Sequence, residues 1–169
     1  AASDVYNRQA MQAIPTIVQS LPRLIRNGHN PTDRAHMSQA ATLAGMAFLS
    51  GRVHLGHAVG HALGGAYHVP HGVACIVMMP QIMALIAAQR PRAMAVFADA
   101  FGCTVDTFPA TLTRWLADCG VPKLHALLAP AKPSIDTLIT LFEGEDRLIG
   151  LSPVRPSHAQ WHAMIEAAW

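Results

Sequence analysis

The sequence predicts an all-α fold, and three observations support this prediction. Apolar residues recur every three or four positions along most of the chain, which is the period of a helix with one buried face. The strict alternation of polar and apolar residues that is typical of half-buried strands is almost absent. Segments rich in glycine or proline, at 28–31, 64–65 and 153–156, separate the periodic stretches as helix-ending signals do.

The first third of the chain predicts two long helices. The first ends before the break at 28–31 and keeps its apolar residues on one face, at Ile14, Val18, Leu21 and Ile25. The second begins near Thr32 and Asp33 and is rich in alanine, which permits close approach of a neighbouring helix. Its inward face is expected to carry Met37, Ala40, Ala41, Ala44 and Phe48.

The remainder predicts a bundle of shorter helices. A helix over 53–63 is expected to end at Gly64-Gly65, and a loop over 66–70 leads into one apolar helix over 73–88. Further helices are expected at 92–101, 106–119, 134–142 and 157–168. No internal repeat or flexible linker interrupts the pattern, so we expect residues 1–169 to form a single helical domain.

The composition indicates a covered surface and argues against nucleic-acid binding. Charged residues make up 13% of the chain and hydrophobic residues 51%, and this charged share is about half of that in ordinary soluble domains. Part of the surface is therefore expected to contact another subunit, as in a dimer or other homo-oligomer, or another domain. The net charge of +2 is too small, and its Lys and Arg residues are too scattered, for a nucleic-acid surface.

The chain shows the features of a cytoplasmic protein. Residues 1–8 lack the apolar core of a signal peptide. The run 73–88 is short for a membrane span and contains Pro80 and Gln81, so a buried helix is the better interpretation and no membrane is expected. An odd number of cysteines without a CxxC pair indicates buried thiols in a reducing compartment: Cys75, Cys103 and Cys119.

Histidines are the strongest chemical signal. Five of the ten lie between His54 and His71. His57 and His61 are one helical turn apart on one face, and paired imidazoles are good ligands for divalent iron or zinc. The glycines at 64–65 would let the chain reverse, so that His71 returns over the same face. An HxxxH pair alone is only moderately specific, because buried histidines are often hydrogen-bonded core residues, and we interpret His54 and His68 as structural or exposed.

The wider pattern around these histidines resembles the signature of the iron-containing (group III) alcohol dehydrogenases. The matching positions are His57, His61, Leu63, Gly64, Gly65, Pro70, His71, Gly72 and Pro80. The segments 21–23 and 41–48 are also similar to that family, and the closing segment 151–169 looks like its maleylacetate reductase branch. Gly72 instead resembles the ordinary alcohol dehydrogenases of the family, so the sequence does not identify the substrate.

The resemblance implies a fold and a set of roles. Members have a nucleotide-binding half and a C-terminal helical half, of dehydroquinate synthase-like fold, that carries the metal. Fe²⁺ is the metal first expected, with Zn²⁺ as the alternative, held by an aspartate and three histidines. His57 and His71 occupy two of these ligand positions, although spacing alone would favour His57 and His61. His61 occupies the place of a histidine beside the substrate and nicotinamide, and we expect it to relay a proton in catalysis.

The implied activity is metal-assisted hydride transfer between a small alcohol, aldehyde or keto substrate and NAD(P). The Asp-x3-His motif that would supply the other two ligands is not matched, since Asp4 precedes Arg8 and Asp33 precedes Met37 at this spacing. A Gly-rich phosphate loop is also missing. We therefore expect the N-terminal nucleotide-binding domain to be absent from these 169 residues, which would be inactive unaided and associate with such a domain.

Two alternatives stay open on the sequence. The chain could be a non-catalytic helical dimerisation or scaffold domain that has lost the nucleotide half and two metal ligands. It could also be a small metal- or haem-binding helical protein with an HxxxH site, although that would not explain the Gly64-Gly65 and Pro70-His71-Gly72 elements together.

Overall fold

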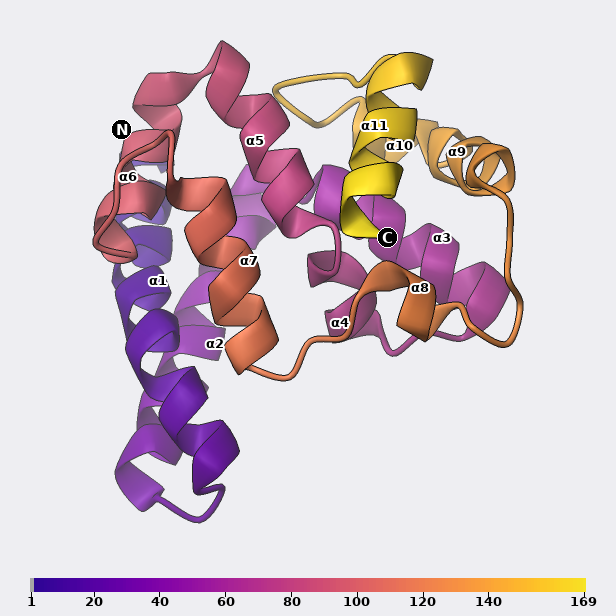
Figure 1. Ribbon diagram of the computed structural model, residues 1–169. Coiled ribbons are helices and arrows are strands. Elements are labelled where there is room, and N and C mark those ends of the chain that lie inside the picture. The colour runs from indigo at the N-terminus through magenta and orange to yellow at the C-terminus, as the bar shows by residue number, and fades with distance from the viewer. Residues whose placement is uncertain (1) are drawn as a thin grey trace. The chain divides into compact units, whose positions relative to one another are not determined.

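The computed structural model describes the backbone of residues 2–169 and the side chains of residues 8–49 and 51–169. Over these residues the chain forms helices and no strands, which confirms the all-α prediction (Figure 1). The helices are α1 (Ala2–Arg26), α2 (Pro31–Gly51), α3 (Leu55–Tyr67), α4 (His71–Ile76), α5 (Met79–Gln89), α6 (Pro91–Ala100), α7 (Phe108–Asp118), α8 (Leu124–Leu127), α9 (Ile135–Glu143), α10 (Asp146–Ile149) and α11 (His158–Ala168).

The helices gather in two compact units. The first unit comprises the residues up to Arg52 together with 92–119, and so contains α1, α2, α7 and nearly all of α6. The second unit comprises 53–91 and 120–169 and contains the remaining helices. A single domain over 1–169 stays a prediction, and each unit is described by itself.

In the first unit α1 and α2 form a helical hairpin. The break predicted at 28–31 lies between the end of α1 at Arg26 and the start of α2 at Pro31. Asn30 caps α2, since its side-chain oxygen accepts hydrogen bonds from the backbone N–H groups of Thr32 and Asp33 at 3.0 and 3.2 Å. Pro31 occupies the first helical position, where a missing N–H has no cost.

An ion pair joins the two helices of this hairpin, and in it the carboxylate of Asp33 is buried whereas the side chain of Arg23 is 48% exposed. Both Nε and Nη2 of Arg23 donate to the carboxylate of Asp33, at distances between 2.6 and 3.2 Å, and Asp33 is 3% exposed. Nη2 also donates to the hydroxyl of Ser20 at 3.2 Å. Hydrogen bonding from Arg23 lowers the pKa of Asp33, with its positive charge adding to the effect against the opposing influence of burial.

This ion pair predicts a component of acid sensitivity. A carboxyl group whose pKa is lower in the folded state stabilises the fold above the pKa of the unfolded aspartate, about 4, and loses that contribution as the pH falls through the folded value. Replacing Asp33 by Asn should therefore lower the free energy of unfolding at neutral pH and flatten its decline in acid. Urea unfolding of both proteins at several pH values tests this, and parallel declines would contradict it.

The prediction of which residues form the buried face of α2 is largely wrong. Of its five residues only Ala40 is buried, whereas Ala41 is exposed and Phe48 is 53% exposed. The reason is that α2 packs mainly against α1, so residues of α2 that face away from α1 stay exposed. Met46 and Leu49 are also exposed near the C-terminal end of α2.

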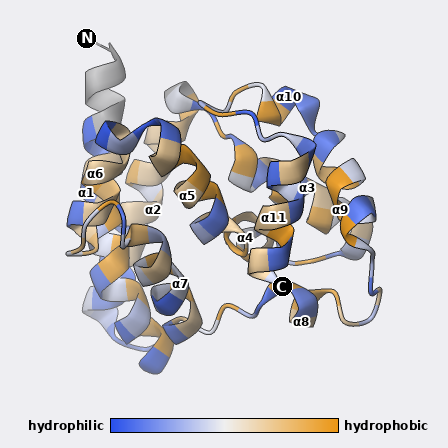
Figure 2. Cartoon of the chain, turned by 45° about the horizontal axis from the view of Figure 1, so that its top comes forward, coloured by the Kyte–Doolittle hydropathy of each residue, from blue (hydrophilic) through white to orange (hydrophobic). Residues whose placement is uncertain are grey.

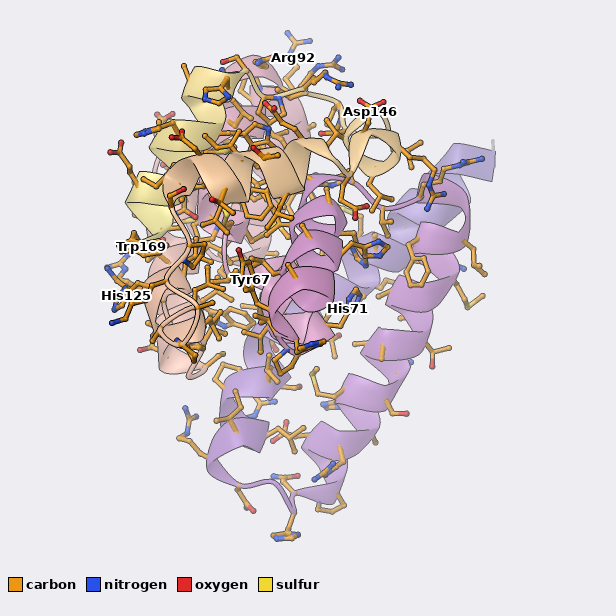
Figure 3. The ribbon with its side chains drawn as sticks, turned by 90° about the vertical axis from the view of Figure 1, so that its right-hand side faces the viewer. Tyr67, His71, Arg92, His125, Asp146 and Trp169 are labelled. Atoms are coloured by element: carbon orange, nitrogen blue, oxygen red, sulfur yellow. The ribbon has the colours of Figure 1, made fainter. Side chains whose placement is uncertain are left out.

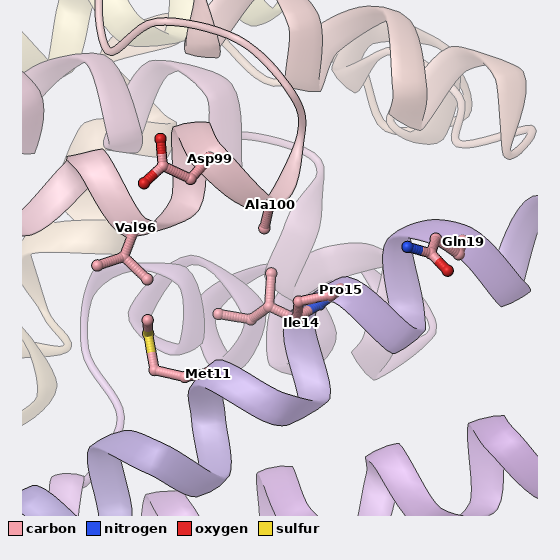
Figure 4. Close-up of a pocket in the computed structure, with 7 residues that line it drawn as sticks. All are labelled: Met11, Ile14, Pro15, Gln19, Val96, Asp99 and Ala100. Atoms are coloured by element: carbon pink, nitrogen blue, oxygen red, sulfur yellow. The ribbon is translucent and has the colours of Figure 1, made fainter.

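Aromatic residues and a small cavity complete the first unit. The ring of Phe101 lies 5.4 Å from that of Phe108 and 5.6 Å from that of Trp115, between centroids. The indole N–H of Trp115 donates to the carbonyl of Val18 on α1 at 3.2 Å. A cavity of about 340 Å³ lies between α1 and α6, where Met11 faces Val96 (Figure 4). Its lining contains no histidine or cysteine.

The second unit is built around α3. This helix contacts α4, α5, α9 and α10, and α11 packs on α5, α8 and α9. Leu55, Leu63 and Ile139 are fully buried, and the ring of Trp161 packs 5.4 Å from that of Phe142. Helices such as α9 carry both hydrophobic and hydrophilic residues, as amphipathic helices do (Figure 2). At the C-terminus His125 on α8 lies beside Trp169 and hydrogen-bonds to its carbonyl oxygen (Figure 3).

The predicted end of the histidine helix is wrong. Helix α3 continues through Gly64 and Gly65 to Tyr67, because single glycines in a helix cost only about 1 kcal/mol each. The chain reverses instead at His68, which adopts the left-handed conformation with φ 56° and whose N–H bonds to the carbonyl of Gly64. Pro70 then precedes α4.

The single apolar helix expected over 73–88 is divided into α4 and α5 by a turn at Val77 and Met78. Pro80 explains the break, because it lacks an N–H and its ring would clash with the carbonyl of Ile76 in a continuous helix. By length and composition His71–Gln89 could cross a membrane, a test that core helices also pass, and 44% of its apolar window is buried. Since this segment is broken and packs on α3 and α11, we interpret it as core.

Candidate metal centre

Three imidazoles meet where α3 passes α4. His57 and His61 lie one turn apart on α3, and His71 is the first residue of α4. The turn at His68–Pro70 returns the chain, so that His71 lies beside α3 (Figure 3). The ring centroids of His57 and His71 are 5.4 Å apart, those of His61 and His71 5.9 Å, and those of His57 and His61 6.4 Å.

A cysteine that sequence reasoning missed joins this cluster. The nitrogens of His57 and His71 and the sulfur of Cys75 each provide one donor atom, and these donors lie within 4.8 Å of one another. Sγ of Cys75 is 3.5 Å from Nε2 of His71. The His-x3-Cys spacing could have revealed this residue, because side chains four apart share a helix face.

Two glycines of α3 allow α4 to approach closely. A Cβ atom at Gly60 would overlap Sγ of Cys75 and would lie only 3.3 Å from the backbone nitrogen of that residue. A Cβ atom at Gly56 would lie 2.7 Å from the terminal methyl of Met79 and 3.0 Å from the carbonyl oxygen of Cys75. The absence of side chains at these positions thus places the thiol directly against the face of α3 that carries His57.

The surroundings favour a neutral His57. Burial lowers the pKa of its imidazole, and the nearby charges of His71, His61 and His54 lower it further. A neutral imidazole has the free lone pair that a metal ligand needs. Burial also raises the pKa of the Cys75 thiol, so without a cation the sulfur stays protonated.

His61 lies on the more open side of the cluster. Its side chain is 44% exposed, and its Nδ1 is 3.7 Å from Oε2 of Glu145, between α9 and α10. Sequence reasoning missed Glu145, for which no local pattern gave a signal because it lies far from His61 along the chain.

The other two histidines of the segment differ from each other. His54 precedes α3, burial lowers its pKa, and its buried Nδ1 has no hydrogen-bond partner among the described residues. His68 is exposed and forms the left-handed end of α3. Neither belongs to the group of donor atoms formed by His57, His71 and Cys75.

Comparison with known protein families identifies the family of the chain. Residues 1–132 match the model of the C-terminal part of the Fe-containing alcohol dehydrogenase family. The chain belongs to this family. Within it, the chain is similar to long-chain-alcohol dehydrogenase 1 of Geobacillus thermodenitrificans, with 29% identity over 99% of the chain and 45% of that protein. It is 35% identical to the 1,3-propanediol dehydrogenase of Klebsiella pneumoniae, over 72% of the chain and 34% of that protein.

Solved structures of this family of iron-containing alcohol dehydrogenases share the fold. A 1,3-propanediol oxidoreductase superposes with a TM-score of 0.88 at 28% identity, over 98% of the chain and 45% of that protein. The maleylacetate reductase of Agrobacterium tumefaciens has a TM-score of 0.81 at 21% identity, over 98% of the chain and 45% of that protein, which shows the fold alone. The chain thus spans less than half the length of the relatives it matches.

Proposed function

We propose that the chain is the metal- and substrate-binding part of an NAD(P)-dependent iron-containing alcohol dehydrogenase. The observation that carries this proposal is the convergence of His57 and His71, from two different helices, with ring centroids 5.4 Å apart. A fold alone would not support it, since a scaffold domain could keep the same helices. Donor nitrogens of these two imidazoles lie within 4.8 Å of each other, an arrangement that suits a shared metal ion and that helix packing alone does not require.

The donor set fits a divalent metal. His57 and His71 would hold it. Imidazole nitrogen suits both Fe²⁺, which the family suggests first, and Zn²⁺ as the alternative. Such a metal supplies Lewis acidity to the oxygen of an alcohol or carbonyl substrate during hydride transfer. Because His71 and His61 are exposed, a small alcohol, aldehyde or keto substrate could reach the cluster from solvent.

His61 has the role of a proton relay in this proposal. It lies beside His57 and His71 and would therefore be close to a substrate bound at the metal, and Oε2 of Glu145 lies 3.7 Å from its Nδ1 on the other side. A histidine with one face toward the site and another toward solvent can hold the proton of the substrate hydroxyl and release it.

The nicotinamide cofactor would come from another part of the enzyme. The relatives are more than twice as long as their match to this chain, and we propose that a nucleotide-binding domain or subunit completes the site. The 169 residues would be inactive unaided. Their low charge content fits such an association, or a dimer. The three free thiols fit the reducing cytoplasm.

Metal analysis of the purified chain tests the proposal against the scaffold alternative. After anaerobic incubation with Fe²⁺ or Zn²⁺ and removal of excess ion, elemental analysis should find about one metal per chain. A chain that retains no metal in either case would contradict the proposed site and favour the non-catalytic dimerisation or scaffold domain.

Replacing His61 by Ala should separate catalysis from metal binding. In a chimera that joins the chain to the nucleotide-binding half of the Klebsiella pneumoniae relative, NADH formation from 1,3-propanediol should fall by about 10²-fold, the usual scale for losing a proton-transfer group. Metal content should remain at the level of the unmodified chimera. If His61→Ala instead empties the site, His61 is a ligand and the assignment of roles is wrong.

A further inference from the structure

We propose that His158 and His162 form a second metal site, on the surface of the second unit, that takes the divalent ions Ni²⁺ and Cu²⁺. The two residues are the first and fifth of α11, so they lie one helical turn apart on one face. Neither belongs to the donor group of His57, His71 and Cys75. The inference is therefore independent of the proposed function.

The fold fixes the helical turn that carries both rings. Ser157 and Gln160 form a capping box: the hydroxyl of Ser157 accepts from the backbone N–H of Gln160 at 3.3 Å, and Oε1 of Gln160 accepts from the N–H of Ser157 at 2.8 Å. Trp161, in the same turn, is 1% exposed and anchors it in the core. His158 and His162 thus project from a well-held first turn of α11.

Both imidazoles are open to ions in solution. The side chain of His158 is 65% exposed and that of His162 is 44% exposed. The Cβ atoms of residues four apart on a helix are about 5–6 Å from each other. Rotation of the two side chains can therefore bring a nitrogen of each ring to one ion without any movement of the backbone.

A carboxylate lies beside the Nδ1 atom of each ring. Oε1 of Glu143, at the end of α9, is 3.9 Å from Nδ1 of His158, and Oε2 of Glu166 is 3.3 Å from Nδ1 of His162. A histidine that binds metal almost always donates its other ring N–H to such an acceptor, which fixes the tautomer and makes the ligand nitrogen more basic. Carboxylates beside both Nδ1 atoms leave the Nε2 lone pair of each ring for an ion.

This donor set favours ions that need few protein ligands. Two imidazoles, with water in the remaining positions, suit the square-planar or tetragonal sites of Cu²⁺ and Ni²⁺, which also stand high in the affinity order of divalent metals. Zn²⁺ is held by at least three protein ligands in structural and catalytic sites, so it should bind this pair less well. The simpler interpretation is that both histidines only form exposed ion pairs, which contribute little to stability.

Calorimetric titration with Ni²⁺ distinguishes these interpretations. Ni²⁺ is the probe because Cu²⁺ would oxidise the free thiols of the chain. The background is the full chain with His57→Ala and His71→Ala, which disable the first cluster and leave α11 unchanged. This background should bind Ni²⁺ at one equivalent. Adding His158→Ala or His162→Ala should weaken the binding by about tenfold or more, since even a residue that supports a ligand contributes that much.

Two further variants of this background separate a built site from scattered surface imidazoles. His29→Ala removes an exposed imidazole of the first unit and should leave the affinity for Ni²⁺ unchanged. Glu166→Gln keeps the size of the side chain but removes the charge beside Nδ1 of His162, and it should weaken binding by about tenfold.

Unchanged affinity in the His158 and His162 variants would overturn the proposal, and so would an equal loss in His29→Ala. Unchanged affinity in Glu166→Gln would overturn the role given to the carboxylates. Circular dichroism establishes that each variant is folded. If the background itself unfolds, the wild-type chain loaded first with one equivalent of Zn²⁺ replaces it, with the same expected results.

Discussion

Replacing Gly60 by valine is expected to lower the free energy of unfolding by about 3 kcal/mol, the upper end of the usual cost of overpacking. The physical reason is the contact between α3 and α4. A Cβ atom at Gly60 would overlap Sγ of Cys75 and would lie 3.3 and 3.4 Å from the backbone nitrogen and Cα of the same residue. A side chain can rotate away, but a backbone can yield only if α4 moves as a whole.

Gly65 provides the matched control in the same helix. A Cβ atom there would meet nothing within 4 Å, so Gly65→Val adds the same side chain without a collision. Because valine has a somewhat better helix propensity than glycine, this variant should unfold at the same or a slightly higher urea concentration. Urea unfolding followed by circular dichroism measures both variants. Equal destabilisation of the two would show that the close approach of α3 and α4 is not the reason why a side chain at residue 60 destabilises the fold.

Replacing His57 by alanine is expected to abolish stoichiometric retention of Zn²⁺ or Fe²⁺. His57 shares its cluster with His71 and Cys75, so its loss removes one of three neighbouring donors. Losing residues that merely support a ligand weakens metal binding by about 10- to 100-fold, and the loss of a ligand should cost at least that much. Competition with a chromophoric chelator measures the affinity directly.

His29→Ala is the control for this loss. His29 is exposed between α1 and α2, in the first unit, and its substitution removes an imidazole from the chain without touching the cluster. The His29 variant should bind metal as the wild type does, and His71→Ala should behave like His57→Ala. Equal affinity in all four proteins would mean that the metal binds elsewhere or only adventitiously.

The sequence was sufficient for the fold class and for the location of the histidine cluster. Helical periodicity is a local property, and the spacing of His57 and His61 on one turn follows from helix geometry alone. The resemblance to the iron-containing alcohol dehydrogenases then indicates His71, and not His61, as the second metal ligand beside His57. The family match over residues 1–132 confirms that resemblance.

The errors concern interactions that local patterns do not encode. Gly64 and Gly65 were expected to end α3, yet packing of the helix outweighs their poor propensity and the reversal occurs at His68. Pro80 divides the apolar stretch, although its composition suggested one helix. The exposure of Phe48 depends on which surfaces of α2 the rest of the chain covers.

The residues missed at the site have the same explanation. Cys75 enters the cluster only because Gly60 lets α4 approach, and that pairing of positions on two helices is tertiary information. Glu145 reaches His61 from a segment between α9 and α10. The His-x3-Cys spacing marks Cys75 as a neighbour of His71, but only the contact between α3 and α4 brings it to His57, and nothing in the local sequence singles out Glu145.

The central claim is that His57 and His71 bind one cation together, and X-ray absorption at the zinc edge tests it most directly. With one equivalent of Zn²⁺, the fine structure of the wild-type chain should show two imidazole ligands at about 2.0–2.1 Å, and His71→Ala should show one. A shell of oxygen neighbours without imidazole scattering, unchanged by His71→Ala, would contradict the claim.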